Sequence, residues 1–504
     1  MLTEHVSYFF SRSAISLAEG NVDNAVSLLN QAKQSHMAQE YQLTWAWRIS
    51  VLQGHIYSTL GHLGDAIEIY ERAFDELISD SMMMPFGLGR ARFLGSRRTL
   101  IRDYMESLVK IHDFDKAFLV AIRGQGLLVR SIGSNVDMSG LEGDRKNEYL
   151  ECVRDFEQAT ERFDRAVKQC AGVSDSAFEQ CVFSARVERT IAFESLVEWL
   201  EEGSSSISIG AVDQQQLSNS LTDEQSLLVL YPSRGEWYAF LLSRGRLYFR
   251  VLKQPSNAFD EWPQIIGQSA HLYVSTGGFP GANTLHRTLD EHGTPWASKL
   301  TLSYLPSVDR ILGSMSEQGE VVSVFGDPNL DLGLMSTGLP NLIEETLGPA
   351  VQLKMGDEVT RAALISELSR SDAVIFVGHG YRECEQLGNC LGLAEGAMFG
   401  AMDILEMGVG PRVVLIIACH SSESARLAIS ESIGLTEAFL AVGTETVLVA
   451  EGAVPEAEAL EFLKRFLAAG GAQNPAKAYK TVVSQLVEEG STLDWGRFRV
   501  VGLR

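Results

Sequence analysis

The chain has 504 residues, of which 45% are hydrophobic and 21% charged, so it is long enough for more than one core and has the composition of a folded protein. It carries 42 Lys and Arg against 65 Asp and Glu, and its net charge of -23 argues against direct binding of nucleic acid or an anionic membrane. The N-terminus lacks a basic start followed by an apolar core, and no later run reaches the ~20 apolar residues of a membrane span, so we expect a cytoplasmic protein.

Apolar residues recur at helical spacing through roughly the first 200 residues. Three segments, which begin at Gly20, Gly61 and His112, share a turn residue followed by small residues at the fifth and twelfth positions. Such spacing lets two antiparallel helices approach closely along one seam. The pattern resembles tetratricopeptide (TPR) repeats, although the copies lie further apart than the ~34 residues of that family, and a plain helical bundle is the alternative. We predict a TPR-like helical array over residues 1–135 that binds a regulatory protein or complex.

Residues 136–221 are predicted to form a helical connector that ends in a serine-rich linker. Strand patterns begin after it: Ser226–Tyr231 and Trp237–Leu242 predict a hairpin, and Arg246–Leu252 a third strand. Downstream, short apolar runs alternate with helical segments, an order that predicts a mainly parallel sheet covered on both faces. These runs are Thr301–Leu305, Val321–Phe325, Ala373–Val377, Val413–Ala418 and Thr446–Ala450.

Two of these runs lead directly into residues with catalytic chemistry. Ala373–Val377 is followed by Gly378, His379 and Gly380, and Val413–Ala418 by Cys419. The segment between the two runs is long enough for a crossover helix. If the strands are parallel neighbours, His379 and Cys419 emerge at the same edge of the sheet, which is where such sheets bind ligands.

A cysteine and a histidine in this arrangement suit acyl transfer. A thiol with a pKa of about 8.5 is scarcely ionised at neutral pH, whereas an imidazole with a pKa of about 6.5 can accept its proton and later protonate a leaving amine. This pair requires neither a metal nor a cofactor. The backbone N–H groups of Gly380 and Cys419 are candidate donors of an oxyanion hole.

Other interpretations of these residues stay open. A buried structural cysteine and a hydrogen-bonded loop histidine would produce the same sequence pattern. We expect the side chain of His420, next to the nucleophile, to point elsewhere, although it is a second candidate for the base. His379, Cys384, Cys390 and Cys419 offer four zinc ligands, but they lack a tight Cys-x-x-Cys pair, and we predict no metal site.

A set of ordered motifs resembles a known family from about Gln225 to Arg504. The motifs are Thr301–Ser307, Phe325–Pro328, Leu339–Pro340, Ser371–Gly380, Ile417–Cys419, Gly434–Gly443 and Trp495–Phe498. In this order they resemble the CHAT family, which consists of caspase-like domains that are often joined to TPR repeats and are related to caspases and separases. The resemblance implies an α/β caspase-like fold with a non-catalytic (pseudo-caspase) half over 222–320 and a catalytic half over 321–504.

The resemblance also implies roles for individual residues. It assigns His379 as the base and Cys419 as the nucleophile. The chain departs from the family pattern at Ile375-Phe376 and at His420-Ser421-Ser422, which bears on the shape of the substrate pocket. Residues of that pocket are predicted to be Gly378, His420, Ser421 and Glu451. Glu451 and the other acidic side chains of the loops after the strands could favour basic substrates, or could form only a solvated acidic loop: Glu383, Glu385, Glu456 and Glu458.

The function implied is that of a cysteine endopeptidase that cleaves a dedicated protein partner under the control of the TPR-like part. Proteins that look like this act in bacterial antiphage defence, where the substrate is a gasdermin or another effector. The alternative is a catalytically silent scaffold or signalling adaptor, because a caspase-like fold can persist after activity is lost. The presence of both His379 and Cys419 counts against this alternative.

Overall fold

The computed structural model describes most of the chain. The described residues are 2–37, 46–83, 88–125, short runs between 147 and 195, 212–277, 282, 284–313, 319, 321–349, 351–382, 389–422, 425–428 and 431–503. They divide into two compact units, one of residues 1–120 with 134–211, and one of residues 121–133 with 212–504. Each unit is described below by itself.

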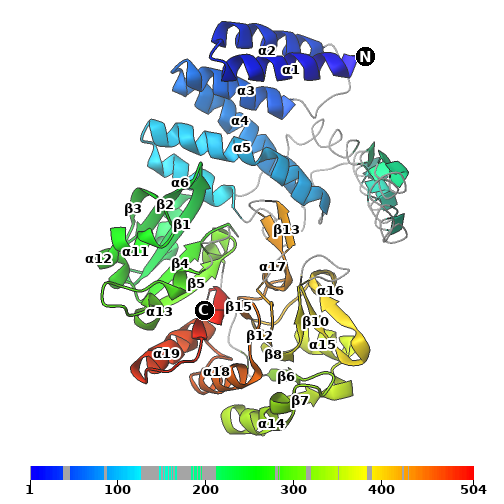
Figure 1. Cartoon of the computed structure of the whole chain (residues 1–504), viewed down its shortest axis with the longest axis vertical. Helices are drawn as coiled ribbons and strands as arrows, with labels where there is room; N and C mark the ends of the chain where they lie inside the picture. Colours follow the sequence, from blue (N-terminus) through cyan, green and yellow to red (C-terminus); the bar gives the residue numbers. More distant parts are fainter. Residues whose placement is uncertain are drawn as a thin grey trace. The chain divides into compact units, whose positions relative to one another are not determined.

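Helical hairpins build the N-terminal unit (Figure 1). Its helices are α1 (Leu2–Ala18), α2 (Val22–Met37), α3 (Ala46–Thr59), α4 (Leu63–Met83), α5 (Leu88–Lys110) and α6 (Phe114–Arg123), of which α6 continues past the boundary of the unit. Consecutive helices contact each other from α1 to α5. The all-α N-terminal part is therefore confirmed.

The repeated motif occupies the turns of these hairpins. Gly20 and Gly61 adopt φ angles of 78° and 80°, and His112 adopts 61°, so all three turns use the left-handed conformation that glycine tolerates best. The alanines of the motif line the seams, where Ala25 and Ala66 are 0% exposed. Each copy of the repeat pattern thus corresponds to a turn followed by closely packed helices, as in TPR-like repeats.

One eleven-stranded sheet forms the centre of the C-terminal unit, with the order β3-β2-β1-β4-β5-β16-β15-β12-β8-β6-β7. Its strands are β1 (Gln225–Ser233), β2 (Glu236–Ser243), β3 (Arg246–Leu252), β4 (His271–Ser275), β5 (Thr301–Leu305), β6 (Val322–Gly326), β7 (Gln352–Met355), β8 (Ala373–Gly378), β12 (Val413–Ala418), β15 (Thr446–Ala450) and β16 (Phe498–Gly502). Two small sheets accompany it: β9 (Gly380–Tyr381) with β10 (Cys390–Gly392) and β11 (Met398–Gly400), and β13 (Ala425–Ala428) with β14 (Glu431–Ile433).

The large sheet contains two groups of parallel strands that run in opposite directions, and at one end β2 runs antiparallel to β1 and β3. In one half β1, β4, β5 and β16 run parallel, and in the other half β15, β12, β8, β6 and β7 run parallel. The halves join where β15 and β16 pair antiparallel. The carboxyl ends of β6, β8, β12 and β15 therefore share one edge, whereas those of β4 and β5 lie at the opposite edge. Of these six strands, only β6, β8, β12 and β15 therefore end at the first edge.

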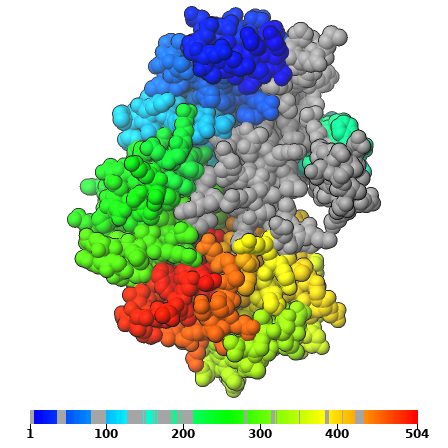
Figure 2. Space-filling model, in the orientation of Figure 1, coloured from blue at the N-terminus to red at the C-terminus, as the bar shows by residue number. Residues whose placement is uncertain are grey.

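Helices cover the sheet. They are α10 (Gln214–Ser220), α11 (Asn257–Glu261), α12 (Pro263–Gly267), α13 (Trp296–Lys299), α14 (Gly333–Leu347), α15 (Arg361–Leu368), α16 (Ala401–Met407), α17 (Leu435–Ala441), α18 (Glu456–Ala468) and α19 (Pro475–Glu488). Side chains of α14, α18 and α19 form one core with alternate residues of β8 and β12, including Ile375 and Leu415, both 0% exposed. The intervening residues Phe376 and Ile416 are also buried, so both faces of these strands are covered. α18 and α19 contact each other and form the orange-red and red surface of Figure 2.

The predicted fold class is confirmed. The expected hairpin and third strand are β1, β2 and β3, and the five downstream runs are β5, β6, β8, β12 and β15. The sequence analysis did not identify β4, β7 or the small sheets. Within the described residues, none of the helices combines the length and the apolar character needed to cross a bilayer.

A buried ion pair joins the amino ends of the two strands that lead to His379 and Cys419. Asp372 precedes β8 and Arg412 precedes β12, and their closest side-chain atoms, Oδ2 and Nη2, lie 2.8 Å apart. The guanidinium is 3% exposed and also donates to the carbonyl of Gln473 (3.1 Å). Because the pair spans two neighbouring strands, it helps to hold their register.

We predict that Asp372→Ala lowers the free energy of unfolding of the C-terminal unit by about 3–5 kcal/mol, since it leaves a buried guanidinium without its carboxylate. Hydrogen exchange at the β8 and β12 amides measures this change. Glu345→Ala is the control, because it removes an ion pair between Glu345 and Lys464, whose side chains are 64% and 53% exposed, respectively. Its effect on the free energy of unfolding should stay below ~1 kcal/mol. Equal effects of the two substitutions would contradict the structural role of the buried pair.

Candidate active site

Three neighbouring parallel strands carry the candidate residues to one edge of the sheet. β6 pairs with β8 up to Gly326 and Val377, and β8 pairs with β12 up to Gly378 and Ala418. His379 and Cys419 each follow the last paired residue of their strand, so their backbones occupy adjacent positions on neighbouring strands.

A close backbone contact joins the two loops that begin there. A Cβ atom added to Gly380 would lie 2.0 Å from the carbonyl oxygen of Cys419 and 3.3 Å from the Cβ of Ala418. No side chain fits at this distance. Gly378 is also confined, because an added Cβ would lie 3.1 Å from Cδ of Pro328. Gly380 thus permits the loop after β8 to pack against the loop after β12, and Gly378 lets the end of β8 pack against Pro328 in the loop after β6.

The thiol of Cys419 contacts the loop that follows β15. Its Sγ atom accepts a hydrogen bond from the N–H of Val454 (3.4 Å) and lies 3.9 Å from the carbonyl oxygen of the same residue. Cys419 is a free, half-buried cysteine. A backbone N–H directed at sulfur stabilises negative charge there, because the N–H dipole has its positive end toward the acceptor.

The imidazole of His379 contacts the loop that follows β6. Its Nε2 atom lies 3.0 Å from Oδ1 of Asp331, and the two side chains are 35% and 54% exposed. The ring also lies beside Tyr381, with 6.4 Å between the ring centroids. Among the contacts of the described residues, no hydrogen bond joins this imidazole to the thiol of Cys419. The strand register makes the two residues neighbours, while each side chain is bound to a different loop.

The turn after Cys419 is fixed from both sides. His420 has a φ angle of 58°, a left-handed conformation that is uncommon outside glycine. Its N–H donates to the carbonyl of Gly452 (2.7 Å), and its Nδ1 accepts from Nε of Arg382 (3.2 Å). Strained backbone of this kind persists where surrounding contacts determine it.

A buried amide supplies the remaining contacts of this turn. Asn389 is 1% exposed, and its Nδ2 donates to the carbonyls of His420 (3.0 Å) and Ser421 (2.8 Å). Its Oδ1 accepts from the N–H of Leu435 at the start of α17 (3.1 Å). One side chain therefore links the loop after β12 to α17.

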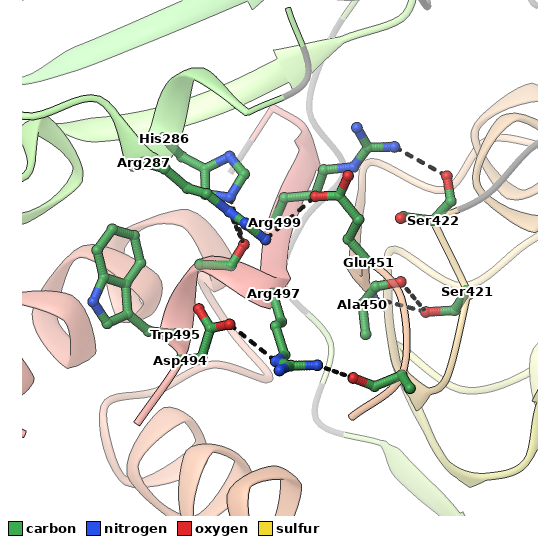
Figure 3. Close-up of polar contacts among 12 residues, drawn as sticks. His286, Arg287, Ser421, Ser422, Ala450, Glu451, Asp494, Trp495, Arg497 and Arg499 are labelled. Carbon is green, nitrogen blue, oxygen red and sulfur yellow. Dashed lines mark hydrogen bonds and ion pairs between the residues drawn. The ribbon is translucent and has the colours of Figure 1, made fainter. Parts of the chain in front are cut away.

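The serines that follow His420 are structural contacts of the edge (Figure 3). The hydroxyl of Ser421 accepts from the N–H of Ala450 (2.7 Å), and the N–H of Ser422 donates to the carbonyl of Ala450 (2.9 Å). Nη2 of Arg499, on β16, donates to the carbonyl of Ser422 (3.1 Å). Ser421 is 1% exposed, so its hydroxyl is not open to a substrate in this structure. Its hydrogen bond instead connects the loop after β12 to the end of β15.

Glu451 lies at the end of β15 and faces an arginine (Figure 3). Its Oε2 is 3.4 Å from Nη2 of Arg287, and the two side chains are 39% and 42% exposed. Arg287 also donates through Nε to the carbonyl of Gly496 (2.8 Å), which fixes its position. The predicted pocket acid is therefore accessible, with its charge partly balanced by a neighbouring guanidinium.

Arg497 holds the loop that contacts the thiol. Its guanidinium donates to the carbonyl of Ala453 and, through Nε, to Asp494 (3.0 Å), and its own carbonyl accepts from the N–H of Glu451 (2.7 Å). Ala453 immediately precedes Val454. This arginine thus fixes the segment whose N–H reaches Sγ of Cys419.

The residues of this edge that the sequence analysis did not assign to the site include Asp331, Asn389 and Arg497. Asp331 is 48 positions from His379, and Asn389 is 31 positions from His420, so no local pattern reveals either contact. The only sequence signals were the turn after β6 and the closing segment at Trp495, and neither indicated a partner.

Some predicted residues lie outside the described part of the chain: Glu383, Cys384 and Glu385. Within the described part, no group of three or more His, Cys, Asp or Glu side chains is arranged to hold a metal ion.

Comparison with known proteins identifies the class of the C-terminal unit. Its mixed, mostly parallel sheet between helices is an α/β caspase-like domain, and residues 268–502 match the model of the CHAT domain family. The chain thus contains a CHAT domain. No curated protein matches the chain.

Solved structures similar to the chain include two crystal structures of the Saccharomyces cerevisiae separase–securin complex. Each shares 10% sequence identity with the chain, with TM-scores of 0.42 and 0.41. The matches cover 100% of this chain and 53% of the other, so the chain spans about half the length of those structures.

We predict that Gly380→Ala lowers the free energy of unfolding of the C-terminal unit by ~1–3 kcal/mol, because the new methyl group would collide with the backbone carbonyl of Cys419. The thermal midpoint of the full chain measures this effect. Gly333→Ala is the matched control, since an added Cβ there meets nothing within 4 Å. Wild-type stability of Gly380→Ala would contradict the close contact between the two loops.

Proposed function

We propose that the chain is a cysteine endopeptidase in which Cys419 is the nucleophile and His379 the general base. The observation that carries this proposal is the register of β8 and β12, whose last paired residues immediately precede His379 and Cys419. The match to the CHAT family over residues 268–502 supports it, because both residues lie in that range and the motifs around them resemble the segments that carry the base and the nucleophile in that family. A cysteine and a histidine with these surroundings suit acyl transfer.

The reaction would begin with transfer of the thiol proton of Cys419 to the imidazole of His379. The sulfur then attacks the carbonyl carbon of a peptide bond, and the resulting oxyanion is stabilised by the backbone N–H groups of Gly380 and Cys419. The imidazolium gives its proton to the leaving amine as the C–N bond breaks. Water, deprotonated by the imidazole, hydrolyses the thioester and restores the free thiol.

The contact between Cys419 and Val454 must change before this reaction can begin. In this structure the thiol lies against the loop after β15, and the imidazole lies against Asp331. Catalytic hydrogen bonds commonly tighten only when substrate binds. The proposal therefore requires a rotation of the Cys419 side chain about its Cα–Cβ bond, or a shift of the loop after β15, that presents the sulfur to His379.

The substrate we propose is a dedicated protein partner. Gly378, His420 and Glu451 would shape the substrate pocket at this edge, with the buried Ser421 supporting its wall, and the exposed carboxylate of Glu451 would favour a basic side chain. A regulatory protein or complex would bind the TPR-like array of residues 1–135, which the connector of 136–221 joins to the halves 222–320 and 321–504. Binding would then shift the population of the active geometry.

The biological setting we propose is bacterial antiphage defence. There the endopeptidase would cleave a gasdermin or another effector after an infection signal. This setting follows from the family resemblance alone.

A catalytically silent scaffold or signalling adaptor is the second candidate. The observation that favours it is the anchoring of the thiol on Val454 in place of a hydrogen bond to His379. In such a protein the caspase-like fold would serve only to bind partners.

We predict that a peptide electrophile labels Cys419 of the full chain faster than it labels Cys152, the second free cysteine among the described residues. Cys152 is the internal reference, since burial raises the pKa of its thiol and the neighbouring Asp155, Glu151 and Glu148 raise it further. His379→Ala should slow labelling of Cys419 at least ~100-fold, as expected for loss of a general base, and leave Cys152 unchanged.

Mass spectrometry of the labelled peptides gives both rates in one sample. Hydrolysis of candidate protein substrates by the wild-type chain and by Cys419→Ala tests the second half of the reaction. Equal labelling of Cys419 with and without His379 would reject the dyad and support the scaffold.

A further inference from the structure

A carboxylate that the sequence analysis did not identify touches the proposed base. Asp331 lies in the loop after β6, the strand that pairs with β8 on the side away from β12. Its Oδ1 atom is 3.0 Å from Nε2 of His379. Three successive strands thus deliver, in order, a carboxylate, an imidazole and a thiol to one edge of the sheet.

The loop that carries Asp331 is built around a buried carboxylate. Asp327 is 0% exposed, and its Oδ1 accepts the N–H groups of Asp331 (3.1 Å) and Leu332 (3.2 Å). Its Oδ2 accepts the hydroxyl of Ser336 on α14. These bonds cap the entry to α14 and fix the backbone of Asp331 itself.

The same loop is bonded to the strand that leads to His379. The N–H of Asp327 donates to the carbonyl of Val377 on β8 (2.8 Å), two residues before His379, and the N–H of Gly356 donates to the carbonyl of Asp327 (3.2 Å). The contact between Asp331 and His379 is therefore set by a fixed frame and is not a chance meeting of two surface side chains.

The chemistry of this contact determines which nitrogen can act as the base. An ionised carboxylate only accepts hydrogen bonds, so Nε2 of His379 must carry the proton that is donated to Asp331. The lone pair then lies on Nδ1. The nitrogen that faces away from Asp331 is the one available to take a proton from sulfur.

We propose that Asp331 is the positioning residue of the dyad. It fixes the orientation of the His379 ring and stabilises the tautomer that is protonated at Nε2, so that the unprotonated Nδ1 is directed toward Cys419. This role rests on the proposed function. Asp331 does not touch substrate, and its effect passes entirely through His379. Because both side chains are about one-third to one-half exposed, its loss should slow the proton transfer only about fivefold.

A double-mutant cycle on thiol reactivity tests the role. The alkylation rate of Cys419 by iodoacetamide is measured in the full chain for Asp331→Ala, His379→Ala and the double variant. Asp331→Ala should lower the rate about fivefold alone and have no further effect once His379 is absent, because its influence passes through the imidazole. Asp331→Asn, whose amide oxygen can still accept from Nε2, should restore the rate to within about twofold of wild type.

Asn329→Ala is the matched control, since Asn329 is an exposed residue of the same loop, and it should leave the rate unchanged. An Asp331→Ala effect that persists in the His379→Ala background would show a general loosening of the edge and overturn the role. Wild-type reactivity of Asp331→Ala would overturn it as well.

The failure of this role is distinguishable from failure of the proposed function. If His379→Ala itself leaves the alkylation of Cys419 unchanged, the dyad is rejected and Asp331 has no base to position. If His379→Ala slows alkylation and Asp331→Ala does not, the dyad stands and only the positioning role is lost. Spectra of 15N-histidine in Cys419→Ala add an independent readout, in which Asp331→Ala should change the Nε2 resonance of His379.

Discussion

The register between β8 and β12 is the constraint on which the candidate site depends. Because Gly378 and Ala418 are paired, the residues that follow them leave the sheet side by side, and the carbonyl of Cys419 lies where any side chain at position 380 would collide with it. The buried ion pair of Asp372 and Arg412 ties the opposite ends of the same strands. Register and close packing thus place a thiol and an imidazole at adjacent positions, although they lie far apart in the sequence.

The loops around this edge hold the two side chains in separate hydrogen-bonded frames. Asn389 fixes the turn after Cys419, and Arg497 fixes the segment that presents the N–H of Val454 to sulfur. Asp327 fixes the loop that presents Asp331 to His379. Because the frames are separate, a small shift of one loop would change the geometry of the pair while the core below it stays intact.

The direction of the strands explains why the first half of the C-terminal unit contributes little to the site. β4 and β5 run opposite to β8 and β12, so their carboxyl ends open at the other edge. What this half does supply is Arg287, whose guanidinium lies against Glu451 at the end of β15. The charge of Glu451 is therefore balanced by a side chain of the other half, while His379 and Cys419 both come from the half that contains β8 and β12.

The sequence alone determined most of the elements of this protein and singled out its candidate residues, because these depend on local patterns. Unbroken apolar runs such as Val413–Ala418 specify strands buried on both faces, glycine turns such as Gly20 specify helical hairpins, and His379 and Cys419 stand at the ends of their strands. Only the tertiary structure decided that Asp331 meets His379, that Val454 meets the thiol, and that the two halves of the sheet run in opposite directions. These features depend on strand order and on the path of loops, which bring together residues that no spacing rule connects.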